Sequence, residues 1–309
     1  MVFVPPAAIV GFSSVYSQSL VMSGGRGTPM GGRGLAVRPA FDEAFPILMS
    51  RQWWGNTVSP VSFHDVWLTD GLASFSGSLF DTEAGDYDNY KGHWTQARED
   101  LLESSRLGWG KANDVGPLWL GLLNETGKTP RASALLNTSK GAFIIQMLRS
   151  LFWDPHTGDA DFQSMMKDFL QQFANRAVSS EDFQSVVEKH MKPSMDLDHN
   201  HRMDWFFSEW LLTTDVPSYR LEYSLTPQKG GKVLLTGKLT QSGVPPNFRM
   251  LVPVFAEFPG RKDRLLVAAM AGSASGEFKV DLTSAPKRIL LNINHDILAY
   301  KDEVVRQKK

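Results

Sequence analysis

Hydrophobic residues recur at a helical period through the middle of the chain. Between Asp88 and Asp215, apolar side chains return about every 3.6 residues, which keeps them on one face of an α-helix. The pattern predicts helices over Tyr90–Leu107, Ser133–Phe152, Asp159–Ala174, Ser180–His190 and Asp204–Leu212. Ser179 or Ser180 is the expected N-cap of the fourth helix, because acidic residues follow in its first turn.

Towards the C-terminus the period changes from 3.6 to two. Short alternating segments are separated by Gly, Pro and Asn turns, which is typical of an antiparallel β-sandwich. These expected strands are Arg220–Leu225, Lys232–Thr240, Arg249–Phe258, Arg264–Ala269, Gly276–Leu282 and Lys287–Ile293. The charged residues from Glu303 to Lys309 are expected to be frayed.

Two further helices are predicted before the helical region, over Pro39–Asn56 and from about His64 to Leu79. Residues 1–38 contain two Gly-Gly-Arg-Gly repeats, at Gly24–Gly27 and Gly31–Gly34. Such repeats fit an anion-binding or RNA-binding element, or a loop. The lack of interleaved aromatic residues and the balanced charge favour the loop.

Composition narrows the classes of function. A chain of 309 residues is long enough for two or three domains. With 32 basic and 33 acidic residues, nothing indicates nucleic acid or an anionic membrane as a partner. Cysteine is absent, which excludes disulfides, a thiol nucleophile and thiolate metal sites. No clear signal peptide or transmembrane segment is present, so a soluble chain is expected, in a compartment that the sequence leaves open.

The most specific pattern lies in two neighbouring segments. Residues 47–56 read ILMSRQWWGN and residues 67–75 read WLTDGLASF, with Asp70 19 positions beyond Arg51. Together they resemble the aminopeptidase N family of zinc metallopeptidases, gluzincins with a thermolysin-like catalytic domain. That family carries H-E-x-x-H-Q-W-[WF]-G-N followed by W-L-x-E-G-x-A. Two later segments extend the resemblance: Thr138–Arg149 resembles Y-x-K-G-A…M-L-R, and Phe206–Trp210 resembles F-F-x-x-W.

The resemblance implies a zinc site whose ligands are missing here. In the family two His and a Glu bind zinc, and the Glu after the first His is the general base. Those positions fall on Ile47 (first His), Leu48 (base), Arg51 (second His) and Asp70 (third ligand). Hydrocarbon and guanidinium groups neither bind zinc nor accept a proton, and one carboxylate does not hold a catalytic zinc. Thr138 replaces the Tyr that stabilises the oxyanion, with a shorter reach. The sequence therefore predicts no catalytic residues and no cofactor.

Polar and aromatic residues near this motif have two interpretations each. Asp65 matches a family acid that orients a zinc ligand; here it is expected to pair with Arg51 or to cap its helix. Trp53, Trp54 and Trp67 fit either an aromatic substrate platform or a helix-packing core, and the core is favoured.

One concentrated set of possible metal ligands lies elsewhere, comprising His199, His201, Asp196, Asp198 and Asp204. A divalent metal is one interpretation. The favoured alternative is a polar interhelical loop in which Asp204 caps the next helix. Asp70, His199 and His201 stay as weak metal candidates.

We expect a multidomain α+β chain: a partial thermolysin-like metallopeptidase domain (residues 1–85), an α-helical domain (86–217) and an Ig-like β-sandwich (218–303). Because relatives carry a β-rich domain in front, the resemblance also implies N-terminal truncation. The expected function is a catalytically inactive protein-binding, peptide-binding or structural subunit, whose partner could be a chain that supplies the front domain. The alternatives are a zinc aminopeptidase with an atypical or partner-completed site, and a decayed fragment without a role.

Overall fold

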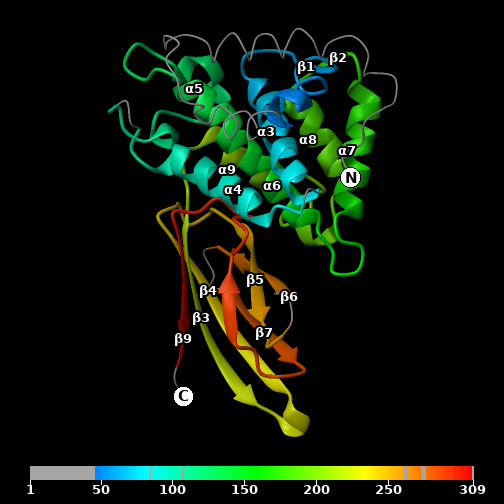
Figure 1. Ribbon diagram of the computed structural model, residues 1–309, viewed down its shortest axis with the longest axis vertical. Coiled ribbons are helices and arrows are strands. Elements are labelled where there is room, and N and C mark those ends of the chain that lie inside the picture. Colours follow the sequence, from blue (N-terminus) through cyan, green and yellow to red (C-terminus); the bar gives the residue numbers. More distant parts are fainter. Residues whose placement is uncertain (1–45, 84, 106–107, 261–263, 273–275, 308–309) are drawn as a thin grey trace, which may run out of the picture.

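The computed structural model describes residues 46–83, 85–105, 108–260, 264–272 and 276–307. Helices and two short strands occupy one end of this part of the molecule, and the strands after residue 217 run away from them at the other end (Figure 1). The chain is therefore of the α+β class. The glycine-rich repeats lie outside the described residues. Within the described part, none of the helices combines the length and the apolar character needed to cross a bilayer.

The helices follow the hydrophobic periodicity closely. Their bounds are α3 Val66–Glu83, α4 Tyr87–Leu102, α5 Ala132–Leu135, α6 Gly141–Phe152, α7 Ala160–Phe173, α8 Ser180–His190 and α9 Asp204–Leu212. A π-helical turn over Leu136–Lys140 joins α5 to α6, so the single predicted helix over Ser133–Phe152 is continuous but irregular. Ser179 caps α8, and its hydroxyl accepts a hydrogen bond from the backbone N–H of Asp182.

The prediction of one helix over Pro39–Asn56 is wrong at its C-terminal end. Residues 46–50 are helical, but the chain leaves the helix after Ser50 and forms turns. Gly55 has a φ of 108°, a conformation that favours glycine, and the Val58 N–H donates to the Trp53 carbonyl. A short strand β1 (Val58–Pro60) follows and pairs in parallel with β2 (Arg176–Val178). Strands of three residues are too short for periodicity to reveal.

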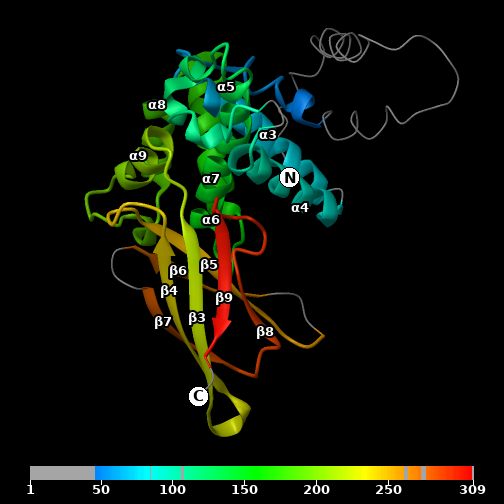
Figure 2. The same ribbon diagram turned by 90° about the vertical axis from the view of Figure 1, so that its left-hand side faces the viewer.

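The strands form two sheets, with orders β7-β4-β3-β9 and β6-β5-β8. Their bounds are β3 Ser218–Pro227, β4 Val233–Ser242, β5 Met250–Glu257, β6 Arg264–Ala271, β7 Gly276–Leu282, β8 Arg288–Leu291 and β9 Lys301–Arg306. Strands β3 and β9 lie side by side in both views and pair in parallel, unlike the entirely antiparallel arrangement expected (Figure 2).

The expectation that residues from Glu303 onward are frayed is also wrong. Glu303 to Arg306 belong to β9, which adds to the edge of the first sheet beside β3, while Lys308 and Lys309 lie outside the described residues. An edge strand gains its backbone hydrogen bonds from one neighbour and tolerates charged side chains facing water. High charge therefore does not exclude strand structure here, and the backbone N–H of Gln307 still donates to the Tyr223 carbonyl.

The contact between α3 and α6 is set by two glycines. A Cβ on Gly71 would lie 2.5 Å from the carbonyl carbon of Gly141, and one on Gly141 would lie 2.7 Å from the Trp67 carbonyl oxygen. The two helices therefore pack backbone against backbone. Both glycines belong to the motif segments singled out in the sequence, so this contact holds those segments together in the core.

The helical part meets the sheets through side chains that bind backbone carbonyls. The half-buried Arg98 on α4 donates to the carbonyls of Ala299, at 2.9 Å, and Tyr300. Asn113 donates to the Thr214 carbonyl at 2.6 Å. The Arg98 contacts fix the loop before β9 against α4, and the Asn113 contact holds the segment between α9 and β3.

Candidate functional site

The segment 46–54 lies against α3 and presents its side chains to it. The Ser50 hydroxyl donates to the Ala73 carbonyl at 2.9 Å, and the Trp54 indole N–H donates to the Ser76 hydroxyl at 3.0 Å. A Cβ on Gly77 would lie 2.5 Å from Ile47 Cγ1. Ile47 therefore packs on the glycine, and Arg51 is placed beside Asp70.

Arg51 and Asp70 form an ion pair at the position of the family's second and third ligands. Arg51 Nη1 lies 2.6 Å from Asp70 Oδ1, and their side chains are 30% and 18% exposed. A charge-assisted hydrogen bond of this length is strong, because both groups carry full charge. The carboxylate that a metal would need is therefore bound to a cation of the protein itself.

The residues present do not fit a zinc ion. Ile47 and Leu48 are half-buried hydrocarbon side chains without lone pairs. Thr138, at the oxyanion position, donates its hydroxyl hydrogen to the Ala134 carbonyl at 2.7 Å, within its own helix. Among the residues with a described placement, no three His, Asp or Glu side chains lie together so as to hold a metal ion.

Asp65 does not pair with Arg51, so that expectation is wrong. One of its oxygens accepts hydrogen bonds from the backbone N–H and the hydroxyl of Ser180, each at 2.8 Å. The other accepts from the Ser62 hydroxyl at 2.7 Å. Asp65 is buried and its charge lies at the positive N-terminal end of α8. It caps a helix, as expected, but that helix is α8 and not its own.

The tryptophans near the motif divide into two groups. Trp54 and Trp67 are buried; Trp54 stacks on Phe169 at 6.3 Å, and Trp67 donates to the Ser180 hydroxyl. The core interpretation is confirmed for these two. Trp53 is half-buried and lines an apolar cavity of about 160 Å³ between this segment, α3 and α7.

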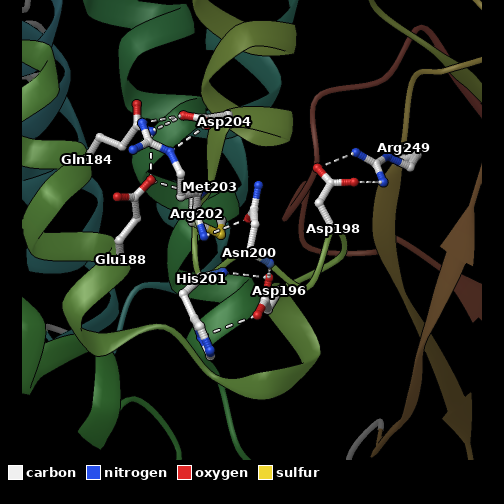
Figure 3. A network of polar contacts seen from close by, with 10 residues as sticks. All are labelled: Gln184, Glu188, Asp196, Asp198, Asn200, His201, Arg202, Met203, Asp204 and Arg249. Carbon is white, nitrogen blue, oxygen red and sulfur yellow. Dashed lines mark hydrogen bonds and ion pairs between the residues drawn. The ribbon is translucent and has the colours of Figure 1, made fainter.

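The loop before α9 holds the histidine and aspartate cluster (Figure 3). The His201 side chain is 92% exposed, with Nδ1 3.4 Å from Asp196 Oδ2. Asp196 also accepts from the backbone N–H groups of Asn200 and His201, which stabilises the positive φ of His201. Asp198 binds Arg249 through two hydrogen bonds, at 2.8 and 3.1 Å.

Asp204 does not cap α9 as expected. Met203 occupies the N-cap position of that helix and provides no side-chain cap, and Asp204 accepts instead from Arg202 and Gln184. The carboxylates of the loop are thus engaged by arginines, an amide and the backbone (Figure 3). Asp70, His199 and His201 are not brought together as a group of metal ligands in the described part of the chain.

Comparison with known proteins decides the family. The profile described as the peptidase family M1 domain matches residues 49–210, which is more than half of the chain. This chain belongs to peptidase family M1. The family relation expected from the motifs is confirmed.

Two curated relatives of this family M1 chain are similar over part of their length. Leukotriene A-4 hydrolase of Xenopus laevis is 23% identical over 183 residues, 58% of this chain and 27% of its own. Aminopeptidase M1-B of Oryza sativa subsp. japonica is 24% identical over 151 residues, 48% of this chain and 16% of its own. The chain thus spans about a quarter or less of the length of these relatives.

A solved structure extends the likeness to the fold. Aminopeptidase A of Legionella pneumophila, in complex with aspartic acid, matches with a TM-score of 0.51 and 16% identity. The match covers 86% of this family M1 chain and 27% of the Legionella chain. It therefore includes strands as well as helices of the present structure.

Proposed function

We propose that this chain is a catalytically inactive member of family M1 that acts as a protein-binding, peptide-binding or structural subunit. The observation that carries the proposal is the 2.6 Å ion pair between Arg51 and Asp70. The positively charged guanidinium of Arg51 lies where the resemblance to the family implies a zinc ion. At 4 Å and an effective dielectric constant of 20, a divalent ion and a unit cation repel each other by roughly 8 kcal/mol.

Zinc content and peptidase activity test the loss of catalysis. We expect purified protein to contain no stoichiometric zinc by mass spectrometry and to cleave no aminoacyl fluorogenic substrate. Stoichiometric zinc, together with activity that Asp70→Asn abolishes, would contradict the proposal and favour a zinc aminopeptidase with an atypical site. Activity that arises only when another chain is added would favour the partner-completed site.

A restored variant is the matched positive control. The variant carrying Ile47→His, Leu48→Glu, Arg51→His and Asp70→Glu has the full ligand set of the family pattern. We expect it to bind zinc at least about tenfold more tightly than the parent chain, because two imidazoles and a carboxylate then replace hydrocarbon and a cation.

An exposed apolar surface supports the binding role. Phe63, His64 and Trp119 form a stack, with ring centroids 3.9 Å apart in each step. Leu122 and Leu123 follow Trp119 after a kink at Gly121 and are 59% and 63% exposed. We call these five residues the apolar stack. Exposed apolar groups gathered in this way are typical of surfaces that another polypeptide covers.

Substitutions in the apolar stack test this role. Fluorescently labelled extended peptides with alternating apolar side chains provide the probe, read by fluorescence polarisation. We expect the double change Leu122→Ser and Leu123→Ser to raise the Kd about tenfold. The reason is that burying two leucine side chains under a bound peptide contributes at least the corresponding binding free energy. Leu212→Ser, at an exposed leucine of α9 outside the stack, is the matched control and should leave the Kd unchanged. Equal loss in both variants would count against the stack.

We further propose the division into a partial thermolysin-like part (residues 1–85), a helical part (86–217) and an Ig-like sandwich (218–303). The change from α9 to β3 within a few residues supports the second boundary. The glycine contact between α3 and α6 means that the first two parts share one core.

A further inference from the structure

A second cavity lies where the helices meet the sheets. Its volume is about 280 Å³, and its walls include Tyr90, Gln146, Arg149, Trp153, Phe255 and Asp296. We propose that this cavity binds an organic cation, namely a primary ammonium group carried on an apolar stem. The proposal is independent of the inactive peptidase role, because none of these residues belongs to the degenerate zinc site.

Gln146 organises the polar wall of the cavity. Its side chain is buried, with 1% of its surface exposed. Its amide nitrogen donates to the Tyr90 hydroxyl at 2.9 Å and to Asp296 Oδ1 at 3.1 Å. Its amide oxygen receives no hydrogen bond from any described residue. Buried polar atoms are rarely left without a partner, so the hydrogen bonding around the Gln146 amide is incomplete among the described residues.

The charges of the wall favour a cation. Arg149 binds Asp159 through two hydrogen bonds, at 3.0 and 2.6 Å, so these two charges compensate each other. Asp296 forms no ion pair with the described residues, and its carboxylate accepts a hydrogen bond from the neutral amide of Gln146. The wall therefore carries two carboxylates, Asp159 and Asp296, against the single guanidinium of Arg149, which also acts on Asp296 electrostatically. An ammonium group supplies three N–H donors and the missing positive charge.

Apolar residues of the same cavity suit an apolar stem. Trp153 follows the end of α6, while Phe255 and Leu265 come from β5 and β6. Cavities that bind small molecules commonly combine such apolar walls with a few convergent polar groups. A phenethylamine-sized molecule would place its amine at Asp296 and its ring at this wall.

The titration of Asp296 gives the site a pH dependence. Burial raises the pKa of Asp296 to about 6, opposed by the nearby Arg149 and by the Gln146 hydrogen bond. Asp159 raises it further. Tyr87 and Tyr90 also line the cavity, and the pKa of Tyr90 is raised to about 12, mainly by burial. The carboxylate is thus ionised at pH 7.5 and mostly protonated at pH 5. Cation binding should therefore weaken about tenfold between these pH values.

Calorimetric titration of the full chain at pH 7.5 tests the proposal with matched probes. Phenethylamine should bind at least about tenfold more tightly than 2-phenylethanol, its neutral counterpart, and 3-phenylpropionate should not bind. N-acetyl-lysine methylamide distinguishes the source of the ammonium group. Binding of this probe as tight as that of phenethylamine indicates the lysine side chain of a partner, and weaker binding indicates a free amine.

Two variants test separately the charge of Asp296 and the free volume of the cavity. Asp296→Asn should weaken phenethylamine binding about tenfold and remove its pH dependence, since the counter-charge is lost. Leu265→Trp should block the cavity and abolish binding without altering its charges. Asp281→Asn, at an exposed residue of β7 outside the cavity, is the control and should bind as the parent does. Equal affinity for amine and alcohol, or full affinity in both cavity variants, would overturn the proposal.

Discussion

Glu209 shows how burial alters the chemistry of a single residue. It lies on α9, where its Oε1 accepts a hydrogen bond from the backbone N–H of Arg249 at 3.0 Å. Its Oε2 is buried and has no partner among the described residues. Desolvation raises the pKa of Glu209 to about 8, although the Arg249 hydrogen bond and charge oppose the shift. The protonated form is therefore favoured in the folded state.

This shift predicts a pH dependence of stability. The folded pKa, about 8, lies above the unfolded value of 4.5, so the folded state binds the proton more tightly. The stabilising effect is complete below pH 4.5 and is lost as the pH rises through 8. Glu209→Gln, which has no charge to desolvate, should raise the free energy of unfolding at pH 9 by about 1–3 kcal/mol. Urea denaturation of the parent chain and the variant at pH 5 and pH 9 checks this prediction. An equal difference in unfolding free energy at both pH values would contradict the raised pKa of Glu209.

At the scale of helices, the two motif segments contact each other where α3 crosses α6, through Gly71 and Gly141. The backbones touch there without intervening side chains, and Trp67 is buried in the core beside them. The W-L-T-D-G segment and the K-G-A segment are thus in direct backbone contact. The glycines allow a close crossing that larger residues would prevent.

Alanine substitutions distinguish this packing glycine from an ordinary helical one. Gly71→Ala should lower the free energy of unfolding by about 3 kcal/mol, because its Cβ would overlap the backbone of Gly141. Gly92→Ala, on α4, is the matched control, since no atom lies within 4 Å of its added Cβ. It should raise stability by about 0.5–1 kcal/mol through better helix propensity. Similar effects at both positions, measured by urea denaturation, would exclude the close crossing.

At the scale of the whole molecule, a few side-chain contacts join the helical part to the sheets. Arg98 binds two carbonyls of the loop before β9, and Trp210 on α9 packs edge-on against Phe248, with ring centroids 5.4 Å apart. The cavity proposed to bind a cation lies at the same junction. Contacts that hold helices against sheets therefore also shape that site.

Removing one junction contact should loosen β9. Arg98→Ala leaves the carbonyls of Ala299 and Tyr300 without their donor, so stability should fall by about 1.5–3 kcal/mol. Hydrogen exchange at the amides of β9 should rise in parallel. Lys189→Ala, which removes an ion pair of an exposed lysine on α8 with Asp168 on α7, is the control and should change stability by less than about 0.5 kcal/mol. Unchanged exchange in β9 would show that Arg98 does not anchor it.

The sequence by itself determined the helices, most strands and the family. The predicted bounds of α8 and α9 agree with the structure, because α8 has one apolar face at the helical period and α9 is a run of mostly apolar, buried residues. The α+β class and the family M1 relation were also predictable, since local motifs carry both. Local pattern failed where structure depends on partners: β1 and β2 are only three residues long, and β9 is a charged edge strand.

Only the tertiary structure decided which polar side chains meet. The sequence allowed an ion pair between Asp65 and Arg51. In the structure Asp65 instead binds Ser180, 115 residues away, and Arg51 binds Asp70. Gln146 and Asp296 are 150 residues apart and line one cavity. Periodicity reports which face of an element is buried, since burial follows hydrophobicity. It carries no information on the partner across the interface, which is fixed by how elements distant in the chain pack together.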